Sequence, residues 1–229
     1  PQGESKSVNI VREKIKTPTV PYFDLLENNN AYIKLSQFKR KSSQEVKNAL
    51  VELDSLSNNQ LNGLILDLRN NPGGLLRECL EIVNLFVPKQ DTILTAKGKN
   101  TSWNKTYVTQ KDPLYENLPI IVLINERSAS ASEIVAGCLQ DLDRGVVLGR
   151  NSFGKGLIQQ NQKLAYNTQL KLTVAKYYTP SGRCIQNRNY NDEGGKDLKI
   201  DTVENSFLTN NGRIVYDGGG IKPDIEMPK

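Results

Sequence analysis

The stretch PIIVLINERSASASEIVAGCLQDLDRGVVLGRNSFGKGLIQQ, residues 119–160, decides the fold of this chain. It opens with the apolar run at residues 120–124, which predicts a strand buried on both faces. Apolar side chains then recur at helical spacing through residues 131–142, and Ser130 and Glu133 have the spacing of a capping box. The stretch therefore predicts a strand that leads through a serine-rich turn into a helix.

A possible catalytic pair follows from this arrangement. Residues 146–148 predict a second buried strand, which leads to Lys155 between two glycines. A helix start offers unpaired N–H groups and positive potential for an oxyanion, so a serine there is well placed as a nucleophile. The chain contains no histidine, which excludes Ser-His-Asp and Cys-His schemes. A lysine acts as the base when burial lowers its pKa, so a Ser–Lys dyad is the hypothesis that fits.

Two other interpretations stay open from the residue types alone. The serines are also explained as a helix cap with spare hydroxyls and Lys155 as a solvated loop lysine, as in a peptide-binding module with an inactive site. In addition, GRNSFGKG at residues 149–156 matches the G-x-x-x-x-G-K pattern of a phosphate loop. Gly156 stands where that pattern needs a serine or threonine for magnesium, which weakens the hypothesis of a nucleotide-binding domain.

Five motifs, spread in order over most of the chain, resemble those of the carboxy-terminal processing (tail-specific) serine proteases. They are LDLRNNPGG at 66–74, NERSASASEIVAG at 125–137, NSFGKGLIQ at 151–159, YYTPSGR at 177–183 and GGGIKPD at 218–224. One such motif would be weak, but five in order are specific. The resemblance implies a core related to the ClpP/crotonase superfamily, built of β-β-α units with additional strands. The strand–helix alternation of the sequence itself indicates an α/β fold.

The resemblance also implies the roles of three residues. The middle serine, Ser130, is the nucleophile, Lys155 is the base, and Gln159 orients the lysine. Lys155 and Gln159 share one face of an extended segment but are about 13 Å apart between Cα atoms in an ideal strand. We therefore expect a bend at Gly156 or a local turn.

Two backbone donors are needed for an oxyanion hole. Ala131 N–H, at the helix start, is one candidate. The second is expected from the turn at residues 71–74, where glycine lets the backbone approach a substrate. The family resemblance points to the same turn, but the sequence does not choose between Gly73 and Gly74.

Two acidic residues are expected to support the site. Glu133 caps the helix or reaches the site, and capping is the simpler role. Asp141 resembles a family aspartate that has been discussed as catalytic, but a straight helix places it about 16 Å from Ser130. We expect Asp141 to pair with Arg144 or with a nearby loop.

The rest of the chain predicts further elements. The helices expected are one of about twelve residues from Ser43 and one at residues 75–86. Residues 187–211 are polar and predict an irregular, mobile surface loop. The strands expected are at residues 8–15, 31–38, 63–68, 92–96, 101–108, 157–164 and 168–178, with the last two forming a hairpin.

Composition limits the partners. The chain has 229 residues, 37% of them hydrophobic, with a net charge of +5, and is predicted to be globular. Its basic side chains are scattered, with only residues 39–41 adjacent, so no nucleic acid partner is expected.

No run is long and apolar enough to span a membrane. An odd number of cysteines and the lack of histidine exclude a full disulfide framework and a zinc site, and no cofactor is expected. The cysteines are Cys79, Cys138 and Cys184.

The family resemblance sets expectations for domains and substrate. A PDZ domain commonly precedes the catalytic core in this family. We expect residues 1–18 to be a strand and linker that follow a missing PDZ domain, and residues 19–229 to be the protease catalytic domain. Pro1 is not a native start, and no signal peptide is visible, so we expect a fragment or a processed chain of an extracytoplasmic protein. Substrates are expected to be polypeptides that bind as an added strand and are cleaved near their C-termini.

Overall fold

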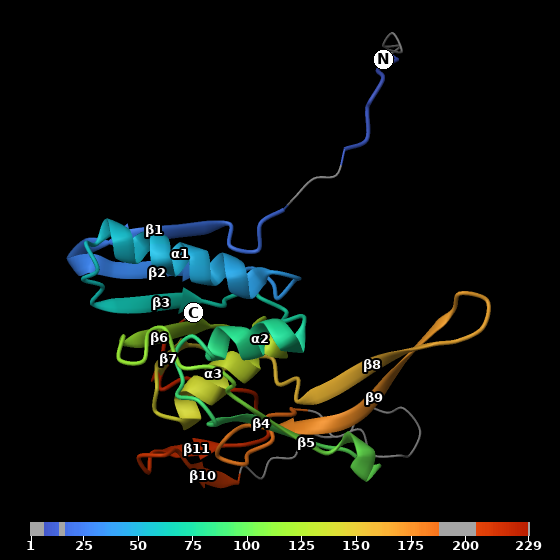
Figure 1. The fold of residues 1–229 in the computed structure, drawn as a ribbon. Coiled ribbons are helices and arrows are strands. Elements are labelled where there is room, and N and C mark those ends of the chain that lie inside the picture. The colour runs from blue at the N-terminus through green and yellow to red at the C-terminus, as the bar shows by residue number, and fades with distance from the viewer. Residues whose placement is uncertain (1–6, 14–16, 188–204, 229) are drawn as a thin grey trace.

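The computed structural model describes residues 7–13, 17–187 and 205–228. Its main sheet has six strands in the order β1-β2-β3-β6-β7-β12 (Figure 1). All neighbours in this sheet are parallel except β1 and β2, which are antiparallel. The strands are β1 (Tyr22–Leu26), β2 (Asn30–Lys34), β3 (Gly63–Asp67), β6 (Ile120–Ile124), β7 (Val146–Gly149) and β12 (Ile225–Glu226). The α/β class expected from the sequence is therefore confirmed.

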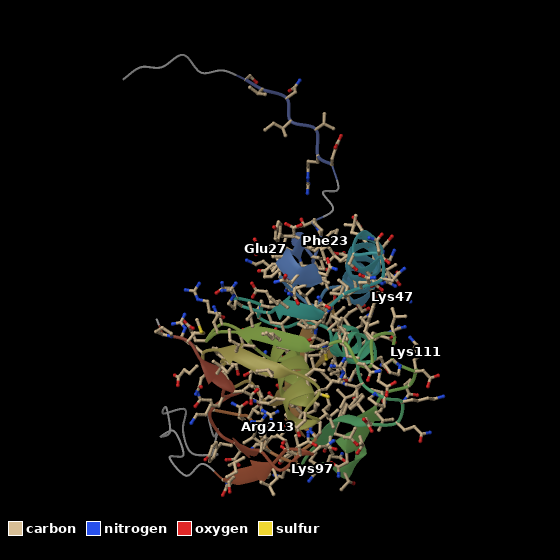
Figure 2. The ribbon with its side chains drawn as sticks, turned by 90° about the vertical axis from the view of Figure 1, so that its left-hand side faces the viewer. Phe23, Glu27, Lys47, Lys97, Lys111 and Arg213 are labelled. Atoms are coloured by element: carbon tan, nitrogen blue, oxygen red, sulfur yellow. The ribbon has the colours of Figure 1, made fainter. Side chains whose placement is uncertain are left out.

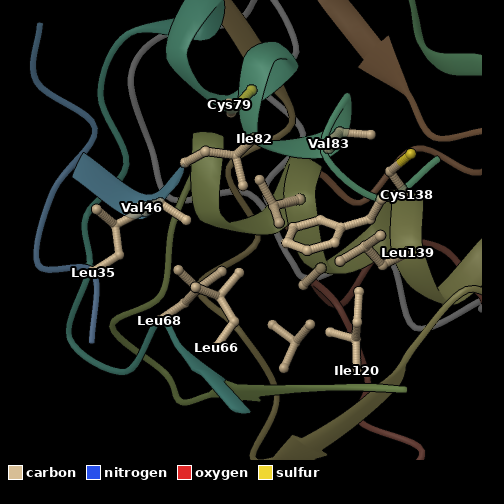
Figure 3. Packing of buried hydrophobic residues seen from close by; sticks show 14 of the residues in the cluster. Leu35, Val46, Leu66, Leu68, Cys79, Ile82, Val83, Ile120, Cys138 and Leu139 are labelled. Atoms are coloured by element: carbon tan, nitrogen blue, oxygen red, sulfur yellow. The ribbon is translucent and has the colours of Figure 1, made fainter. Parts of the chain in front are cut away.

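Three helices cover one face of this sheet: α1 (Ser42–Leu56), α2 (Leu76–Val83) and α3 (Ala131–Asp141). Figure 2 shows the helices on one side of the strands. The apolar stripe of each helix packs on the inward side chains of the strands, because this contact removes both from water. Figure 3 shows the result around Leu66, Ile82 and Leu139, which are all fully buried. Within the described residues, no helix is both long and apolar enough to cross a membrane.

The opposite face of the sheet is open in the described part of the chain. Ile121 on β6 and Val146 on β7 are 38% and 39% exposed. The prediction that residues 120–124 are buried on both faces was therefore wrong, and the predicted buried strand at residues 146–148 is likewise buried on one face only. The physical reason is that all three helices pack on the same side, so alternate side chains of the strands point to solvent.

A second sheet has four strands in the order β5-β4-β9-β8. Its members are β4 (Thr92–Lys97), β5 (Lys105–Val108), β8 (Leu157–Lys163) and β9 (Gln169–Tyr178), and short 3-10 helices lie at Glu27–Asn29 and Thr101–Trp103. The predicted hairpin of β8 and β9 is confirmed, and it projects from the body of the molecule (Figure 1). β8 is an edge strand, so its outer side is unpaired among the described residues.

The two ends of the chain differ from the prediction. Residues 7–13 form no strand and lead away from the body (Figures 1 and 2), while residues 14 and 15 of the expected strand lie outside the described residues. Near the other end, β10 (Ser206–Leu208) and β11 (Ile214–Tyr216) form an antiparallel pair. The expected loop at 187–211 is therefore regular where β10 lies, and residues 188–204 lie outside the described residues. β10, β11 and β12 were missed because such short strands carry almost no periodic signal.

Candidate active site

The structure separates the three serines between β6 and α3. Ser128 and Ser132 are fully buried, and their hydroxyls donate to main-chain oxygens of Leu68 and Asn71 at 2.8 and 2.9 Å. Ser130 is only partly buried and lines a cleft of about 540 Å³. Of the three hydroxyl groups, only that of Ser130 is placed to meet a substrate.

The backbone of Ser130 has an uncommon conformation. This residue is the N-cap of α3, with φ 56° and ψ −111°, in a region that residues with a side chain rarely occupy. The expected capping box with Glu133 is present. Strain of this kind persists only where the surroundings impose it, and it is frequent at catalytic residues. Here the sharp turn between β6 and α3 exposes Ser130 to the cleft.

Glu133 connects the serine to the lysine. Its carboxylate is fully buried and accepts hydrogen bonds from the main-chain N–H of Ser130 at 2.7 Å and of Lys155 at 2.9 Å. It also accepts from Ser152 Oγ and from Gly154 N, both at 2.6 Å. Burial raises the pKa of Glu133, and these hydrogen bonds offset only part of the rise. Glu133 therefore both caps the helix and fixes the loop that carries Lys155.

Tyr177 on β9 joins the same two residues from another side. Its buried hydroxyl lies 2.7 Å from the main-chain oxygen of Lys155 and 3.3 Å from that of Ser130. Burial raises the pKa of Tyr177 well above its usual value, which keeps the hydroxyl protonated as a donor. The backbones of Ser130 and Lys155 are thus each held by a carboxylate at N–H and by a phenol at C=O.

The cleft brings together every predicted residue of the catalytic group. Ser130, Lys155 and Gln159 all line it, and Lys155 is half-buried. A bulge in the pairing of β8 with β9 lies between Ile158 and Gln159, so the irregularity falls two residues beyond Gly156, where the bend was expected. Of these three side chains, none is hydrogen-bonded to another of the three in the structure, and such bonds are often long before substrate binds.

The glycine turn after β3 lies against the serine. A Cβ atom added at Gly73, whose φ is +91°, would meet Ala129 O at 2.5 Å and Ala131 N at 2.8 Å. The N–H of Gly73 donates to Asn71 Oδ1 at 2.9 Å, so it is already used. Gly74, by contrast, is exposed, and within the described residues neither its N–H nor that of Ala131 has an acceptor. The structure therefore distinguishes the two glycines that the sequence left equal.

Asp141 lies away from this cleft. Its Oδ1 accepts from Arg183 Nη2 at 2.7 Å with both side chains fully buried, and its Oδ2 accepts from Ser181 N at 3.0 Å. The expected pairing with a nearby loop is confirmed. The alternative pairing with Arg144 is wrong, because that guanidinium donates to Phe86 O and to a second main-chain oxygen instead.

The loop at residues 149–156 connects two strands, β7 and β8. A phosphate loop requires a helix after its lysine, whose N-terminal N–H groups face the phosphates. Here β8 follows, and the N–H groups of Gly154 and Lys155 donate to Glu133. The structure does not favour the nucleotide-binding alternative.

Two contributors to this arrangement were not identified from the sequence. Ser152 donates to Glu133 and also accepts from Ile221 N at 2.6 Å, which ties the glycine-rich motif near the C-terminus to the site. Tyr177 belongs to a recognised motif, but its role depends on the register of β9. The usable signal was that both are polar residues inside the recognised motifs to which no role had been assigned.

An α/β fold in which a helix-cap serine and a lysine share a cleft with a glycine turn defines a candidate serine hydrolase. Residues 29–201 match the sequence model described as Peptidase family S41. The chain belongs to this family.

Curated relatives carry names consistent with that family. The chain is 41% identical over 180 residues to a "Carboxy-terminal-processing protease" of Bartonella bacilliformis, a match that covers 78% of this chain and 41% of the relative. It is 36% identical over 209 residues to a "Probable CtpA-like serine protease" of Staphylococcus aureus, covering 90% of this chain and 40% of the relative. The chain thus spans about two fifths of the length of these relatives.

Solved structures share the fold. A photosystem II D1 C-terminal processing protease superposes with a TM-score of 0.62 at 27% identity, over 86% of this chain and 42% of the other. A lipoprotein from Streptococcus agalactiae superposes with a TM-score of 0.57 at 17% identity, over 90% of this chain and 64% of the other, and shows the fold alone.

Proposed function

We propose that residues 19–229 form the catalytic domain of a serine endopeptidase that cleaves extended peptides near protein C-termini. The main observation behind this proposal is that only one of the three serines, Ser130, is accessible from the cleft. Ser130 alone leaves the buried turn, and it enters the cleft that Lys155 and Gln159 line. The family membership and the names of the relatives support the same reaction class.

In the proposed reaction, Ser130 Oγ attacks the scissile carbonyl carbon while neutral Lys155 Nζ accepts the hydroxyl proton. The tetrahedral intermediate then collapses, and the ammonium of Lys155 gives this proton to the leaving amine. In the second half of the reaction, water attacks the acyl carbon while neutral Lys155 accepts a proton from it. The lysine ammonium then returns the proton to Ser130 Oγ as the carboxylic acid product leaves. Gln159 orients the lysine Nζ toward the serine.

Gly74 N–H and Ala131 N–H are the proposed donors to the oxyanion. Both lack an acceptor within the described residues, whereas Gly73 N–H is engaged with Asn71. The substrate is proposed to lie as an added strand along the unpaired edge of β8, which borders the cleft. An unpaired strand edge supplies the main-chain donors and acceptors that such a peptide needs.

The decisive test compares three single substitutions. Ser130→Ala is expected to abolish peptide cleavage and labelling by a fluorophosphonate or sulfonyl probe, with the melting temperature retained. Ser132→Ala loses one buried hydrogen bond, and Ser128→Ala loses its bond to Leu68 O and the acceptor of Asn125 N–H. They are expected to lose about 1 and about 2 kcal/mol of stability, and both are expected to keep activity per folded molecule. Labelling of Ser132 in place of Ser130 would overturn the assignment.

The role of the base is tested separately. Lys155→Arg is expected to be inactive while still folded, because a guanidinium keeps its proton at any accessible pH. Near-normal turnover of this variant would exclude the dyad. It would leave another base as the explanation of the activity.

Chelators and cell location complete the proposal. Within the described residues, no cluster of three or more potential metal ligands is present, and we expect EDTA to leave turnover unchanged. An extracytoplasmic location is proposed from the family resemblance. Fractionation of the cells that make the protein tests it, and recovery only in the cytoplasm would contradict it.

A further inference from the structure

One wall of the cleft comes from the β8–β9 hairpin and carries a second lysine. Lys171 on β9 pairs directly with Asn161 on β8, and both residues line the cleft. Directly opposed residues on antiparallel strands point to the same face, so the two side chains project together. Lys171 therefore lies beside the unpaired edge of β8, along which a peptide would run.

The charge of this lysine is not neutralised. Within the described residues, Lys171 takes part in no ion pair, and no carboxylate lines the cleft. The surrounding sequence is also free of acid, since neither aspartate nor glutamate occurs in residues 144–191. An opposite charge on the facing strand would offset the charge of Lys171, and the hairpin sequence supplies no acidic residue for this.

We propose that Lys171 is the cationic part of a subsite that binds a carboxylate of the substrate, so that the preferred substrates are peptides with a negative charge at that point. This inference rests on the proposed peptidase function, because it assumes that a peptide follows β8 from the dyad. The carboxylate has two sources with the same chemistry, an aspartate or glutamate side chain and the C-terminal carboxylate of the peptide.

The register of β8 sets the distance between subsite and dyad. Lys171 is opposite Asn161, which is six residues beyond Lys155. At the rise of an extended strand this is about 20 Å, so the preferred carboxylate lies about six peptide residues from the scissile bond. If the bound carboxylate is the C-terminus of the substrate, Lys171 would determine how many residues from that C-terminus the substrate is cleaved.

Binding to the Ser130→Ala chain, measured by fluorescence anisotropy, tests the subsite without catalysis. A neutral peptide is compared with peptides that carry one glutamate at successive positions, each as free acid and as amide. We expect one glutamate position, or the free C-terminus, to tighten binding by about two- to fivefold, the size of a partly screened ion pair. The gain is expected to shrink as salt is added.

Matched substitutions assign the effect to the residue. Lys171→Glu is expected to lose the preference for the acidic peptide and to favour a peptide with lysine at the same position. Lys163→Glu makes the same change of charge on the same hairpin, but Lys163 does not line the cleft, so the acidic preference is expected to remain. Equal effects of the two variants would show that only the net charge matters and would overturn the subsite.

The outcomes separate this inference from the proposed function. If the unsubstituted chain cleaves the neutral peptide and shows no carboxylate preference in binding or in kcat/KM, the subsite is wrong and the peptidase stands. If it cleaves no peptide but the Ser130→Ala chain binds acidic peptides through Lys171, the subsite stands and the peptidase is wrong. Loss of preference on amidation alone identifies the C-terminus, and loss on Glu→Gln in the peptide identifies a side chain.

Discussion

The two ends of α3 each carry a fully buried carboxylate, and the two are held in different ways. At the C-terminal end, Asp141 pairs with the buried guanidinium of Arg183. At the N-terminal end, Glu133 has no cationic partner within the described part of the chain and accepts from three main-chain N–H groups and one hydroxyl. A buried charge usually needs an opposite charge, so the arrangement at Glu133 is the costlier of the two.

The difference separates stability from function. Asp141 and Arg183 fasten the loop after β9 to α3, well away from the cleft. Glu133 fastens the serine turn to the lysine loop, and the cleft lies directly above both. One end of α3 thus holds a structural loop and the other holds the candidate catalytic pair. A substitution of Glu133 is therefore expected to lower mainly turnover, and a substitution of Asp141 mainly stability.

The largest expected effect on turnover is that of Glu133→Gln. The amide keeps the shape, but its NH₂ group faces N–H donors, so the loops that carry Ser130 and Lys155 separate. A misplacement of about 1 Å can cost about 100-fold in rate, and we expect a loss of kcat of this order with a smaller change in KM. Steady-state kinetics on folded protein measures it, and unchanged kcat would show that the dyad is held in place without Glu133.

Asp141→Asn is the matched control, with the largest expected effect on stability. It leaves the charge of Arg183 buried without a counter-ion, which costs about 3 kcal/mol of unfolding free energy. Turnover per folded molecule is expected to stay within a few-fold of the unsubstituted chain. Urea unfolding together with active-site titration measures both. Complete loss of turnover in a folded variant would mean that Asp141 acts on the site through a relay.

Tyr177→Phe is expected to have an intermediate effect at the functional end. It removes a single hydroxyl that donates to the main-chain oxygens of Lys155 and Ser130. We expect about 1 kcal/mol less stability and a fall in kcat that is smaller than for Glu133→Gln. If kcat falls no more than in Ser132→Ala, which also removes one buried hydrogen bond, Tyr177 serves packing alone.

The smallest expected effect is a pH dependence of stability. Burial raises the pKa of Glu133 in the folded chain above the ordinary carboxyl value of about 4.3. At a pH between the ordinary pKa of the unfolded chain and the raised pKa of the folded chain, Glu133 is more protonated in the folded state. The unfolding free energy therefore falls as the pH rises through this range. This contribution to stability is fully present when the pH is below the ordinary pKa and is lost as the pH rises through the raised pKa of folded Glu133.

The Glu133→Gln variant lacks this titration, which provides the measurement. Its deficit in unfolding free energy relative to the unsubstituted chain is expected to be largest at acidic pH and to narrow as the pH rises. A deficit that is constant across the series, or that grows with pH, would show that the hydrogen bonds to Glu133 outweigh its burial.

Much of the fold was predictable because its central elements have strong periodic patterns. The helical face of residues 131–142 and the capping box at Ser130 were both found. The open face of the main sheet was not, because an apolar run looks the same whether one or both faces are covered. The short strands near the C-terminus were missed, since two or three residues are too few for a period to show.

For the candidate site, the sequence by itself determined the hypothesis about its chemistry. The lack of histidine left lysine as the candidate base, and five motifs in order named Ser130, Lys155 and Gln159 as the candidate residues. Only the tertiary structure decided which neighbours hold them. Glu133 and Tyr177 contact the backbones of both Ser130 and Lys155, and Lys171 lines the cleft. Among the residues that the structure describes, Gly74 N–H has no acceptor, whereas Gly73 N–H does. Those facts depend on turns and strand register that bring distant residues within a few ångströms, and the spacing of residues along a chain does not encode such contacts.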